Sequence, residues 1–267
     1  PSRARGDHSE LATFFMEMRL TQEKPIEGSE CFPLTNSEQV QACCTIARER
    51  LEVGDYDAAC AALRPWWTIE DRPSHEGLSE PAAADLLLTV GTLSGLLASA
   101  RQIEGGQKPA EALLNGAITL FERLGDRTHV AEARIEIACC YWREGLFDLA
   151  RTILRSSLQA LRENDRELKA VALIRLALVE RHAGRLHDAL NLLDQAEPLV
   201  ERCGPWTTGR FHQEFATALK NMGVAEGQAS YFQRALNHYS KALSLFEIIG
   251  NHRYAAAVEN NHGYLLL

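Results

Sequence analysis

Two asparagines, Asn221 and Asn261, stand 40 residues apart in the same local sequence and have side chains suited to holding a peptide. Each is followed by one residue and then by a glycine, Gly223 or Gly263. An Asn amide has one acceptor and two donors, so it can pair with both the N–H and the C=O of an extended peptide. Matching positions of this kind predict a ladder of peptide contacts. The alternative is that each amide only bonds to a neighbouring helix.

A second candidate group is aromatic and cationic and falls in the middle of the chain. Its members are Trp142, Arg143, Arg175, Arg181 and His182. Arg binds carboxylates through two parallel N–H donors, and Trp adds apolar contact area, so this composition suits a carboxylate or an acidic segment. The alternative is that two of the arginines, Arg143 and Arg181, pair with acids of the same region. The candidate acids are Glu132, Glu136 and Glu180.

The motifs of common enzyme classes are absent from the sequence. None of G-x4-G-K-[ST], G-x-S-x-G, H-E-x-x-H and G-x-G-x-x-G occurs. His182, His187 and Asp188 are close in sequence, but their spacing does not place them on one helical face, so they do not predict a metal site. No pattern pairs a nucleophile with a base. We therefore predict a non-catalytic protein with no cofactor and no metal.

The elements that must position these residues form a repeat. A degenerate phrase recurs about every forty residues: a small residue, Gly seven residues later, an aromatic or Leu, Ala, and a second small residue. One clear copy consists of Ala138, Gly145, Phe147, Ala150 and Ser157. The first small residues of the successive copies are Ala47, Ala98, Ala138, Ala177, Gly223 and Gly263. A fixed period of this length predicts a solenoid.

Each part of the phrase has a physical role in a helical hairpin. Small residues let two helices cross closely, and Gly ends the first helix because it tolerates the left-handed conformation of a C-cap. The Ala and the final small residue lie on one buried stripe of the second helix. No stretch alternates apolar and polar residues for long enough to predict a strand. The sequence therefore predicts an all-α fold.

The phrase resembles the tetratricopeptide repeat, over roughly residues 37–267. The period is nearer 40 than the 34 of the standard repeat, as in the longer repeats of bacterial regulators such as the maltose-regulon activator and the peptide-sensing quorum receptors. The resemblance implies a right-handed superhelix of antiparallel helix hairpins, with about five and a half repeats in this chain. Two departures, Trp66 for a small residue and Gln107 for an aromatic, predict irregular packing of the first two repeats.

The resemblance also implies where a partner binds. In this family the first helix of each hairpin lines the concave face. Carried onto this chain, the groove positions of the last two repeats include Lys220, Asn221, Asn260 and Asn261. Those of the third and fourth repeats include Trp142, Arg143, Arg175, Arg181 and His182. The third and fourth repeats carry Glu136 and Arg175 where the later repeats carry Asn, so an Asn ladder would cover only the C-terminal half.

Composition limits the environment and the partners. The net charge of −8 argues against direct nucleic-acid binding by this region, which needs a clustered basic surface. The seven cysteines include the adjacent pairs Cys43-Cys44 and Cys139-Cys140 and no C-x2-C, which is typical of helix packing in a reducing cytoplasm. The most apolar run, residues 81–100, contains Asp85 and predicts a buried solenoid helix rather than a membrane span.

The two ends of the chain differ from the repeats. Residues 1–36 contain Pro25, Gly28 and Pro33 and predict a linker with a short helix from Glu10 to Leu20. That helix is either an N-terminal cap or an internal ligand of the groove. The solenoid spans 37–267, and its sixth copy stops at three leucines, whereas solenoids usually end in a cap with a polar outer face. We therefore expect the chain to be part of a longer protein.

These observations lead to a prediction of function. We expect a cytoplasmic sensor or scaffold region of a bacterial signalling or transcription regulator, which binds a protein or peptide segment in its concave groove. Contacts with a second copy or with an effector domain of the same chain are further expected partners. The alternatives are a small-molecule sensor, with a closed pocket and an aromatic wall near Trp142 or Trp206, and a regulatory domain that contacts an effector enzyme.

Overall fold

The computed structural model describes residues 35–69 and 71–266. Residues 1–34, 70 and 267 lie outside this description, and so does the short helix predicted from Glu10 to Leu20. Residues Thr35–Leu267 form one compact unit of the chain, and all the described helices belong to it.

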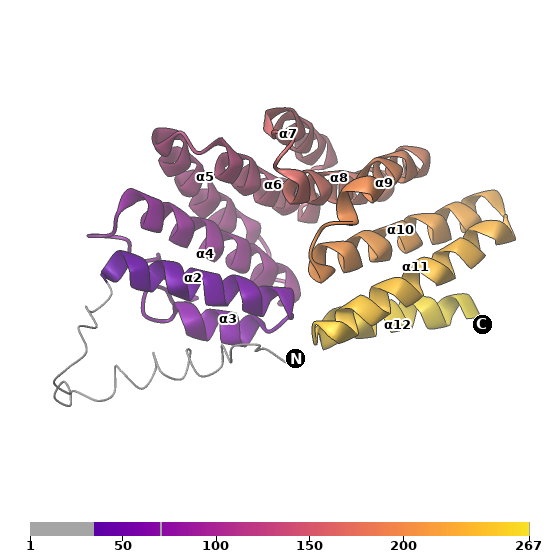
Figure 1. Cartoon of the computed structure of the whole chain (residues 1–267), viewed down its shortest axis with the longest axis horizontal. Helices are drawn as coiled ribbons and strands as arrows, with labels where there is room; N and C mark the ends of the chain where they lie inside the picture. Colours follow the sequence, from indigo (N-terminus) through magenta and orange to yellow (C-terminus); the bar gives the residue numbers. More distant parts are fainter. Residues whose placement is uncertain (1–34, 70, 267) are drawn as a thin grey trace, which may run out of the picture. The chain divides into compact units, whose positions relative to one another are not determined.

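The described residues fold into helices joined by turns and short loops, and no strand occurs among them (Figure 1). The helices are α2 (Asn36–Glu52), α3 (Tyr56–Leu63), α4 (Glu80–Ala100), α5 (Gln107–Leu124), α6 (Arg127–Arg143), α7 (Phe147–Ala160), α8 (Arg166–His182), α9 (Leu186–Val200), α10 (Pro205–Glu226), α11 (Ala229–Ile248) and α12 (His252–Leu266). The predicted all-α fold is confirmed.

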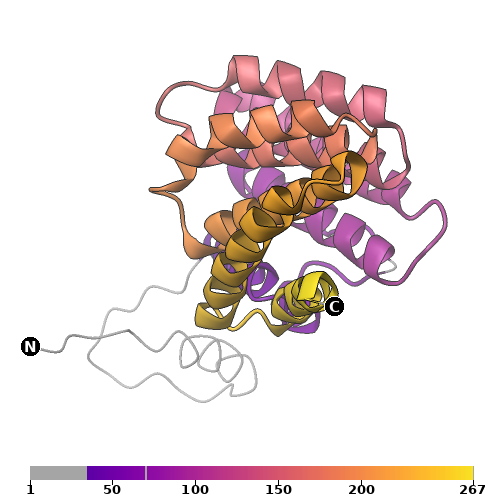
Figure 2. The same ribbon diagram turned by 90° about the vertical axis from the view of Figure 1, so that its right-hand side faces the viewer.

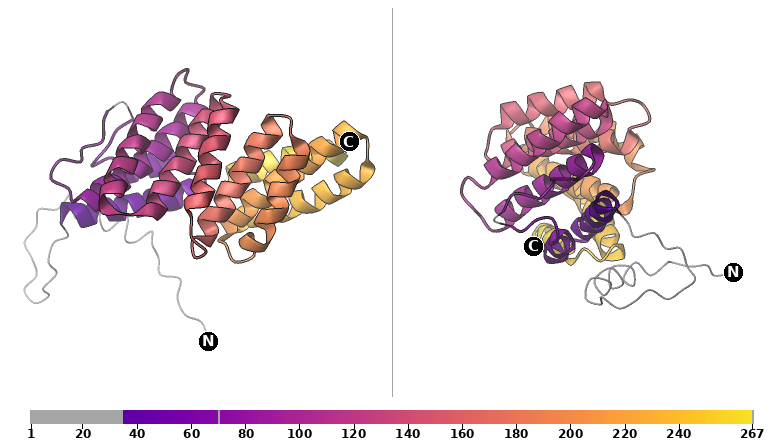
Figure 3. Two further views of the ribbon diagram at one scale, coloured as in Figure 1. Left: turned by 90° about the horizontal axis from the view of Figure 1, so that it is seen from above. Right: turned by 90° about the vertical axis from the view of Figure 1, so that its left-hand side faces the viewer.

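Successive helices pair into hairpins that follow the copies of the repeat. In the third copy, Ala138 is fully buried in α6, and Gly145 sits in the turn before α7 with a φ of 78°. The N–H of Leu146 donates to the carbonyl of Tyr141 at 2.9 Å, which closes the last turn of α6. The left-handed backbone at Gly145 makes this hydrogen bond geometrically accessible. The hairpins are stacked side by side (Figure 3).

The fifth hairpin keeps the tight crossing but moves the turn. A Cβ added to Gly223 would lie 2.7 Å from Cε1 of Phe232, so the ring of Phe232 in α11 packs directly on the backbone of α10. The turn glycine is Gly227, with a φ of 67°, whereas Ser230 at the aligned Gly position already belongs to α11. The fifth hairpin therefore keeps the close helix crossing of the repeat, although its turn lies three residues before the aligned position.

The first two hairpins depart from the others at the residues that break the repeat. After α3, which has only 8 residues, the half-buried Trp66 is followed by the buried Trp67, whose indole N–H donates to the carbonyl of Asp71 at 3.1 Å. In the second hairpin Gln107 is buried at the start of α5, and its Nε2 donates to the carbonyl of Gly95 at 3.0 Å. A polar link thus joins α4 to α5 where other copies use an aromatic residue or Leu.

Buried apolar side chains form clusters along the hairpins rather than around one centre. One cluster joins α2 to α4 around Leu63 and Leu86, and the next joins α4 to α6 around Leu114 and Phe121. Among the described helices, α4 is long and apolar enough to cross a membrane by length and composition, but 72% of its apolar window is buried inside the fold. Its burial between α2, α5 and α6 gives α4 the role of a core helix.

The turn before α12 meets the turn between α2 and α3 (Figures 1 and 2). Asn251 is fully buried, and its Nδ2 donates to the carbonyl of Glu52 at 2.7 Å. A Cβ on Gly54 would lie 2.7 Å from Oδ1 of Asn251, so the two turns are in close contact. We call this contact, formed by residues 52–56 and 251–254, the seam. It closes the superhelix on itself.

Candidate binding site

A cavity of about 750 Å³ lies inside the closed superhelix. It is lined mainly by the first helix of each hairpin, α2, α4, α6, α8 and α10, together with α12. Its walls carry six arginines and four glutamates, although the whole chain has a net charge of −8. The arginines are Arg48, Arg143, Arg175, Arg181, Arg210 and Arg253. The cavity is therefore more cationic than the rest of the chain.

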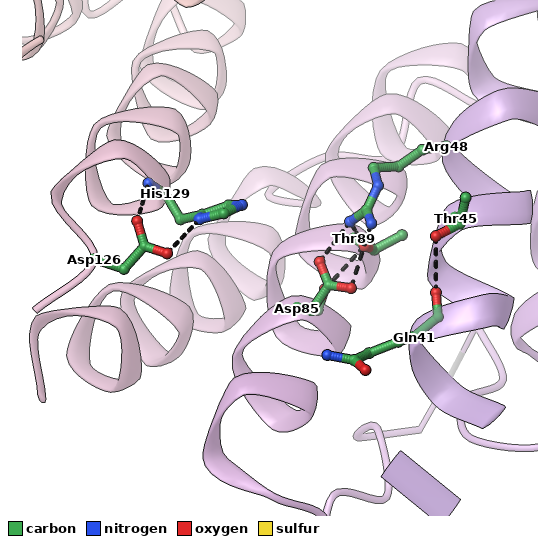
Figure 4. Close-up of polar contacts among 7 residues, drawn as sticks. All are labelled: Gln41, Thr45, Arg48, Asp85, Thr89, Asp126 and His129. Atoms are coloured by element: carbon green, nitrogen blue, oxygen red, sulfur yellow. Dashed lines mark hydrogen bonds and ion pairs between the residues drawn. The ribbon is translucent and has the colours of Figure 1, made fainter. Parts of the chain in front are cut away.

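Arg48 on α2 is paired with the neighbouring repeat. Its Nη1 donates to Oδ1 of Asp85 on α4 at 2.5 Å and to Oγ1 of Thr89 at 3.0 Å (Figure 4). Its Nη2 donates to Oδ2 of Asp85 at 3.3 Å, so the guanidinium grips the carboxylate with both nitrogens. The pair links the first two hairpins at the cavity wall.

Two of the predicted ligand contacts, Arg175 and Arg181 on α8, are held in ion pairs with adjacent repeats. Nη2 of Arg175 donates to Oε1 of Glu136 on α6 at 2.7 Å. Arg181 pairs with Glu214 on α10 through two nitrogens, one of them Nη2 at 3.3 Å from Oε2. Both carboxylates are largely shielded from water. A ligand carboxylate would therefore have to compete with Glu136 and Glu214 for these arginines.

The other members of the predicted patch have different surroundings. Trp142 and His182 meet edge to face with ring centroids 5.2 Å apart. Burial and the charge of Arg181 lower the pKa of His182. Nη1 of Arg143 donates to Oε1 of Gln107 at 3.4 Å, and no ion pair involves Arg143 in the described part of the chain. The alternative, in which Arg143 and Arg181 pair with Glu132, Glu136 or Glu180, is wrong. Arg181 pairs instead with Glu214 on the next repeat, and Arg143 pairs with none of these acids.

The asparagines and their neighbours divide between the cavity and its surroundings. Asn261 lines the cavity, accepts a hydrogen bond from Nζ of Lys220 at 2.9 Å and donates to the carbonyl of Ala257 at 3.0 Å. Lys220, Asn221 and Asn260 are not among the described residues that line the cavity. Asn221 is half-buried and Asn260 is exposed. The ladder of two asparagines therefore remains a prediction.

Glu132 on α6 adds a half-buried carboxyl to the cavity wall. Burial raises the pKa of its carboxyl, the charges of His129 and Arg48 oppose that shift, and those of Glu136 and Asp85 add to it. His129 itself is engaged by Asp126, with Nδ1 and Oδ2 2.6 Å apart (Figure 4). Within the described residues Glu132 has no ion-pair partner within salt-bridge distance.

Further residues converge at the seam. Sequence reasoning had named only Trp206 among them, as a wall of the alternative small-molecule pocket. Arg210 on α10 lies 4.8 Å from the ring centre of Tyr254 and 5.9 Å from that of Trp206. Arg253 on α12 lies 4.9 Å from the ring centre of Tyr56. All five line the cavity. The only sequence signal was local, since Trp206 and Arg210 are four residues apart on one helix face, whereas Tyr56 joins them only through the seam.

The described residues contain no group of three or more His, Cys, Asp or Glu side chains that could hold a metal ion. Nε2 of His187 lies 3.4 Å from Oε1 of Glu226, a residue of another repeat. The described residues that line the cavity present charged, amide, aromatic and apolar groups.

Comparison with solved structures places this fold among known solenoids. A thermophilic tetratricopeptide repeat protein of Thermus thermophilus, TTC0263, is 20% identical, with a TM-score of 0.53 over 82% of this chain and 98% of its own. PlcR of Bacillus thuringiensis, solved with the peptide PapR7 and DNA, is 13% identical, with a TM-score of 0.61 over 86% of this chain and 77% of its own. The apo form of RapI is 12% identical, with a TM-score of 0.55 over 96% and 90%.

The chain has the tetratricopeptide repeat fold. No family model matches the sequence, and no curated protein matches it. The likeness to known tetratricopeptide repeat (TPR) proteins therefore lies in the arrangement of the helices.

Within this TPR solenoid, the predicted site residues fall into two groups. The cavity brings together Trp142, Arg143, Arg175, Arg181, His182 and Asn261. The remaining three, Lys220, Asn221 and Asn260, lie outside its lining, although Lys220 contacts Asn261. The TPR cavity thus includes the predicted residues of α6 and α8 and extends to the seam.

Proposed function

We propose that this chain is a non-catalytic TPR sensor or scaffold of a bacterial regulator, and that it holds a short peptide segment of a partner in its central cavity. The observation that carries the proposal is the cavity of about 750 Å³, to which the first helix of every described hairpin contributes. A volume of this size lies within the range of about 300–1,000 Å³ that is common for ligand pockets.

The chemistry of the cavity wall supports a peptide. The wall combines arginines and glutamates with Trp142, Trp206 and Tyr254 and with apolar side chains such as Ile174 and Leu178. Charged groups can orient the ends of a peptide, while aromatic and aliphatic groups accept its side chains. PlcR, which has the same fold, was solved with a peptide, PapR7. That complex also contains DNA, but the acidic balance of this chain favours a peptide partner over nucleic acid.

A small-molecule sensor is the second candidate function. It is favoured by the two tryptophans, Trp142 and Trp206, which both line the cavity, and by the seam, which closes the superhelix around it. A concave pocket with an aromatic wall suits a compact ligand.

Binding of synthetic peptides tests the proposed function. The chain is incubated with a pool of random seven-residue peptides, separated by gel filtration, and the retained peptides are identified by mass spectrometry. Val171 lines the cavity from α8, so Val171→Trp should fill part of it and remove retention. Leu149→Trp introduces the same side chain at an exposed residue of α7 outside the lining, and it should leave retention unchanged.

Three outcomes are informative. Retention that is lost only in Val171→Trp supports a peptide in the cavity. Equal loss in both variants would place the peptide elsewhere or reflect misfolding, which circular dichroism distinguishes. Absence of peptide retention by the unmodified chain, together with retention of a compound from a metabolite extract that Val171→Trp abolishes, would favour the small-molecule sensor.

A further inference from the structure

The six arginines of the cavity differ in whether a carboxylate neutralises them. Arg48, Arg175 and Arg181 each pair with a carboxylate of an adjacent repeat. Arg143, Arg210 and Arg253 line the same cavity, and the described part of the chain provides no ion pair for any of them. Three guanidinium groups beside one cavity thus have no carboxylate of the described residues within ion-pair distance.

Aromatic rings hold two of these arginines in place without cancelling their charge. Arg210 lies over the ring of Tyr254 at 4.8 Å, and Tyr254 meets Trp206 edge to face at 5.0 Å. Arg253 lies over the ring of Tyr56 at 4.9 Å. A guanidinium stacked on an aromatic face keeps N–H donors in its own plane, where they can bind an oxyanion. In Arg210, Nη1 donates to Oε1 of the neutral Gln213 at 2.8 Å.

The third arginine belongs to the same region. The amide of Gln107 accepts from Nη1 of Arg143 at 3.4 Å, so its partner is neutral. Burial raises the pKa of the Tyr56 hydroxyl, and the charges of Arg253, Arg143 and Arg210 all oppose that rise. The three positive charges therefore act on one place, next to Tyr56. We call Tyr56, Arg143, Trp206, Arg210, Arg253 and Tyr254 the seam cluster.

The carboxylates that line the cavity do not neutralise these three arginines. Glu136 and Glu214 are committed to Arg175 and Arg181. Glu132 lies eleven residues before Arg143 on α6, which corresponds to roughly 16 Å along the helix. Glu52 is exposed and forms no ion pair with any of the three arginines in the described part of the chain. An excess of positive charge therefore remains at the seam.

We propose that the seam cluster binds an oxyanion, and that this anion is the terminal carboxylate of a peptide held in the cavity. The guanidinium fork matches the two oxygens of a carboxylate, and a phosphate presents the same geometry. The peptide assignment rests on the proposed function. The carboxyl of Glu132, whose backbone lies roughly 16 Å along α6 from that of Arg143, can accept a hydrogen bond from the amino end of an extended peptide of about five residues.

The position of the seam cluster gives the anion a second effect. Tyr56 belongs to the first repeat, whereas Arg253 and Tyr254 belong to the last described one. An anion held by both sides adds to the hydrogen bond from Asn251 to Glu52 in closing the seam. Ligand binding is therefore expected to raise the melting temperature of the whole unit, because a ligand that binds only the folded state stabilises it.

The test uses two pools of random five-residue peptides without Asp or Glu, one with a free carboxyl end and one amidated. The unmodified chain should retain the free pool at least ~10-fold better than the amidated pool, and a variant with both Arg210→Gln and Arg253→Gln should lose this preference. Arg155→Gln, at an exposed arginine of α7 outside the cavity, is the matched control and should keep it. Arg210→Lys, which retains charge without the planar fork, should retain an intermediate preference.

The outcomes separate the two proposals. Equal retention of both pools, sensitive to Val171→Trp, would overturn the carboxylate site and leave the peptide function standing. If neither pool is retained, the peptide function fails, and inorganic phosphate is used as the probe. A phosphate-dependent rise in melting temperature that the double variant lacks would then support an oxyanion site for a free anion. No rise would overturn the site as well.

Discussion

Single residues show why particular amino acids are required at particular places. Gly145 has open space around it, since a Cβ there would meet nothing within 4 Å, but its φ is 78°. Ala150, five residues later, is fully buried where α7 meets the core. One position is therefore restricted by backbone conformation and the other by volume, although both belong to the same phrase of the repeat.

Gly145→Val should destabilise the fold by about 2 kcal/mol, because a β-branched residue is strained in the left-handed region. Urea unfolding followed by circular dichroism measures the change. Gly145→Asn is the control and should cost less, since Asn tolerates this conformation. Equal losses for Val and Asn would show that side-chain volume, and not backbone conformation, restricts the position.

The two asparagines of the predicted ladder differ in their position relative to the cavity. Asn261 lines the cavity and Asn221 does not. Asn261→Ala should weaken retention of peptides by about 5-fold, which corresponds to the loss of one ordinary hydrogen bond. Asn221→Ala is the matched variant. Equal weakening by the two variants in fluorescence titrations would support the full ladder, whereas weakening by Asn261→Ala alone would limit the contact to the cavity.

At the scale of helices, polar pairs join neighbouring elements of the solenoid. Arg–carboxylate pairs connect α2 to α4, α6 to α8 and α8 to α10. A pair of histidines connects α10 to α11, with the Nδ1 atoms of His212 and His238 2.9 Å apart. Each contact holds the spacing of adjacent helices, so each is expected to affect stability. The three arginines also line the cavity, so their pairs are expected to affect ligand binding as well.

Arg181→Gln should lower the free energy of unfolding by about 3 kcal/mol, because it leaves the buried Glu214 without its cation. Differential scanning calorimetry checks this loss. The double variant Arg181→Gln/Glu214→Gln should recover part of it, since no unpaired charge then remains. Wild-type stability in Arg181→Gln would instead assign this arginine to ligand binding alone.

The histidine pair predicts a loss of stability in acid. Burial and the charge of Lys241 lower the pKa of His212 to about 4, and burial with the charges of His212, Lys241 and Arg234 lowers that of His238 to about 4. Unfolded chains protonate these rings near pH 6.5. The contribution of the pair to stability is therefore complete above pH 6.5 and is lost as the pH falls toward about 4.

Melting temperatures between pH 7.5 and 4.5 test this dependence. The variant His238→Gln should show a smaller fall in melting temperature than the unmodified chain across this interval. His75→Gln, at an exposed histidine, should follow the unmodified chain. A His238→Gln curve parallel to that of the unmodified chain would show that other groups cause the acid sensitivity.

At the scale of the whole unit, the seam closes the solenoid around the cavity. Oδ1 of Asn251 accepts from the N–H of Tyr254 at 3.0 Å and thereby caps α12, while its Nδ2 donates to Glu52 across the seam. One buried side chain therefore both starts the last described helix and ties it to the first repeat. The cavity depends on this link because residues from both sides of the seam line it.

Asn251→Asp should keep the helix cap but lose the donor across the seam, so the unit should open and its radius of gyration should increase in small-angle scattering. Asn251→Ala removes both contacts and should also cost about 2 kcal/mol of stability. An unchanged radius of gyration in both variants would mean that packing at Gly54 holds the seam without this hydrogen bond.

The sequence by itself determined the hairpins. Gly145 with its aromatic neighbour Phe147, and Gly223 opposite Phe232, act over a few residues or one helix crossing, so their pattern is legible along the chain. The resemblance of this pattern to the tetratricopeptide repeat assigned the first helices to a groove and placed the residues from Trp142 to His182 on its wall, and these residues line the cavity.

Tertiary structure alone decided which arginines are paired and which side chains line the cavity together. Arg175 and Arg181 meet carboxylates of adjacent repeats, and this pairing depends on the rotation between hairpins. The seam depends on the sum of those rotations along the whole solenoid, because Asn251 reaches Glu52 from 199 residues away. Small angles that no local pattern encodes thus add up to bring Arg253 over Tyr56 and create the seam cluster.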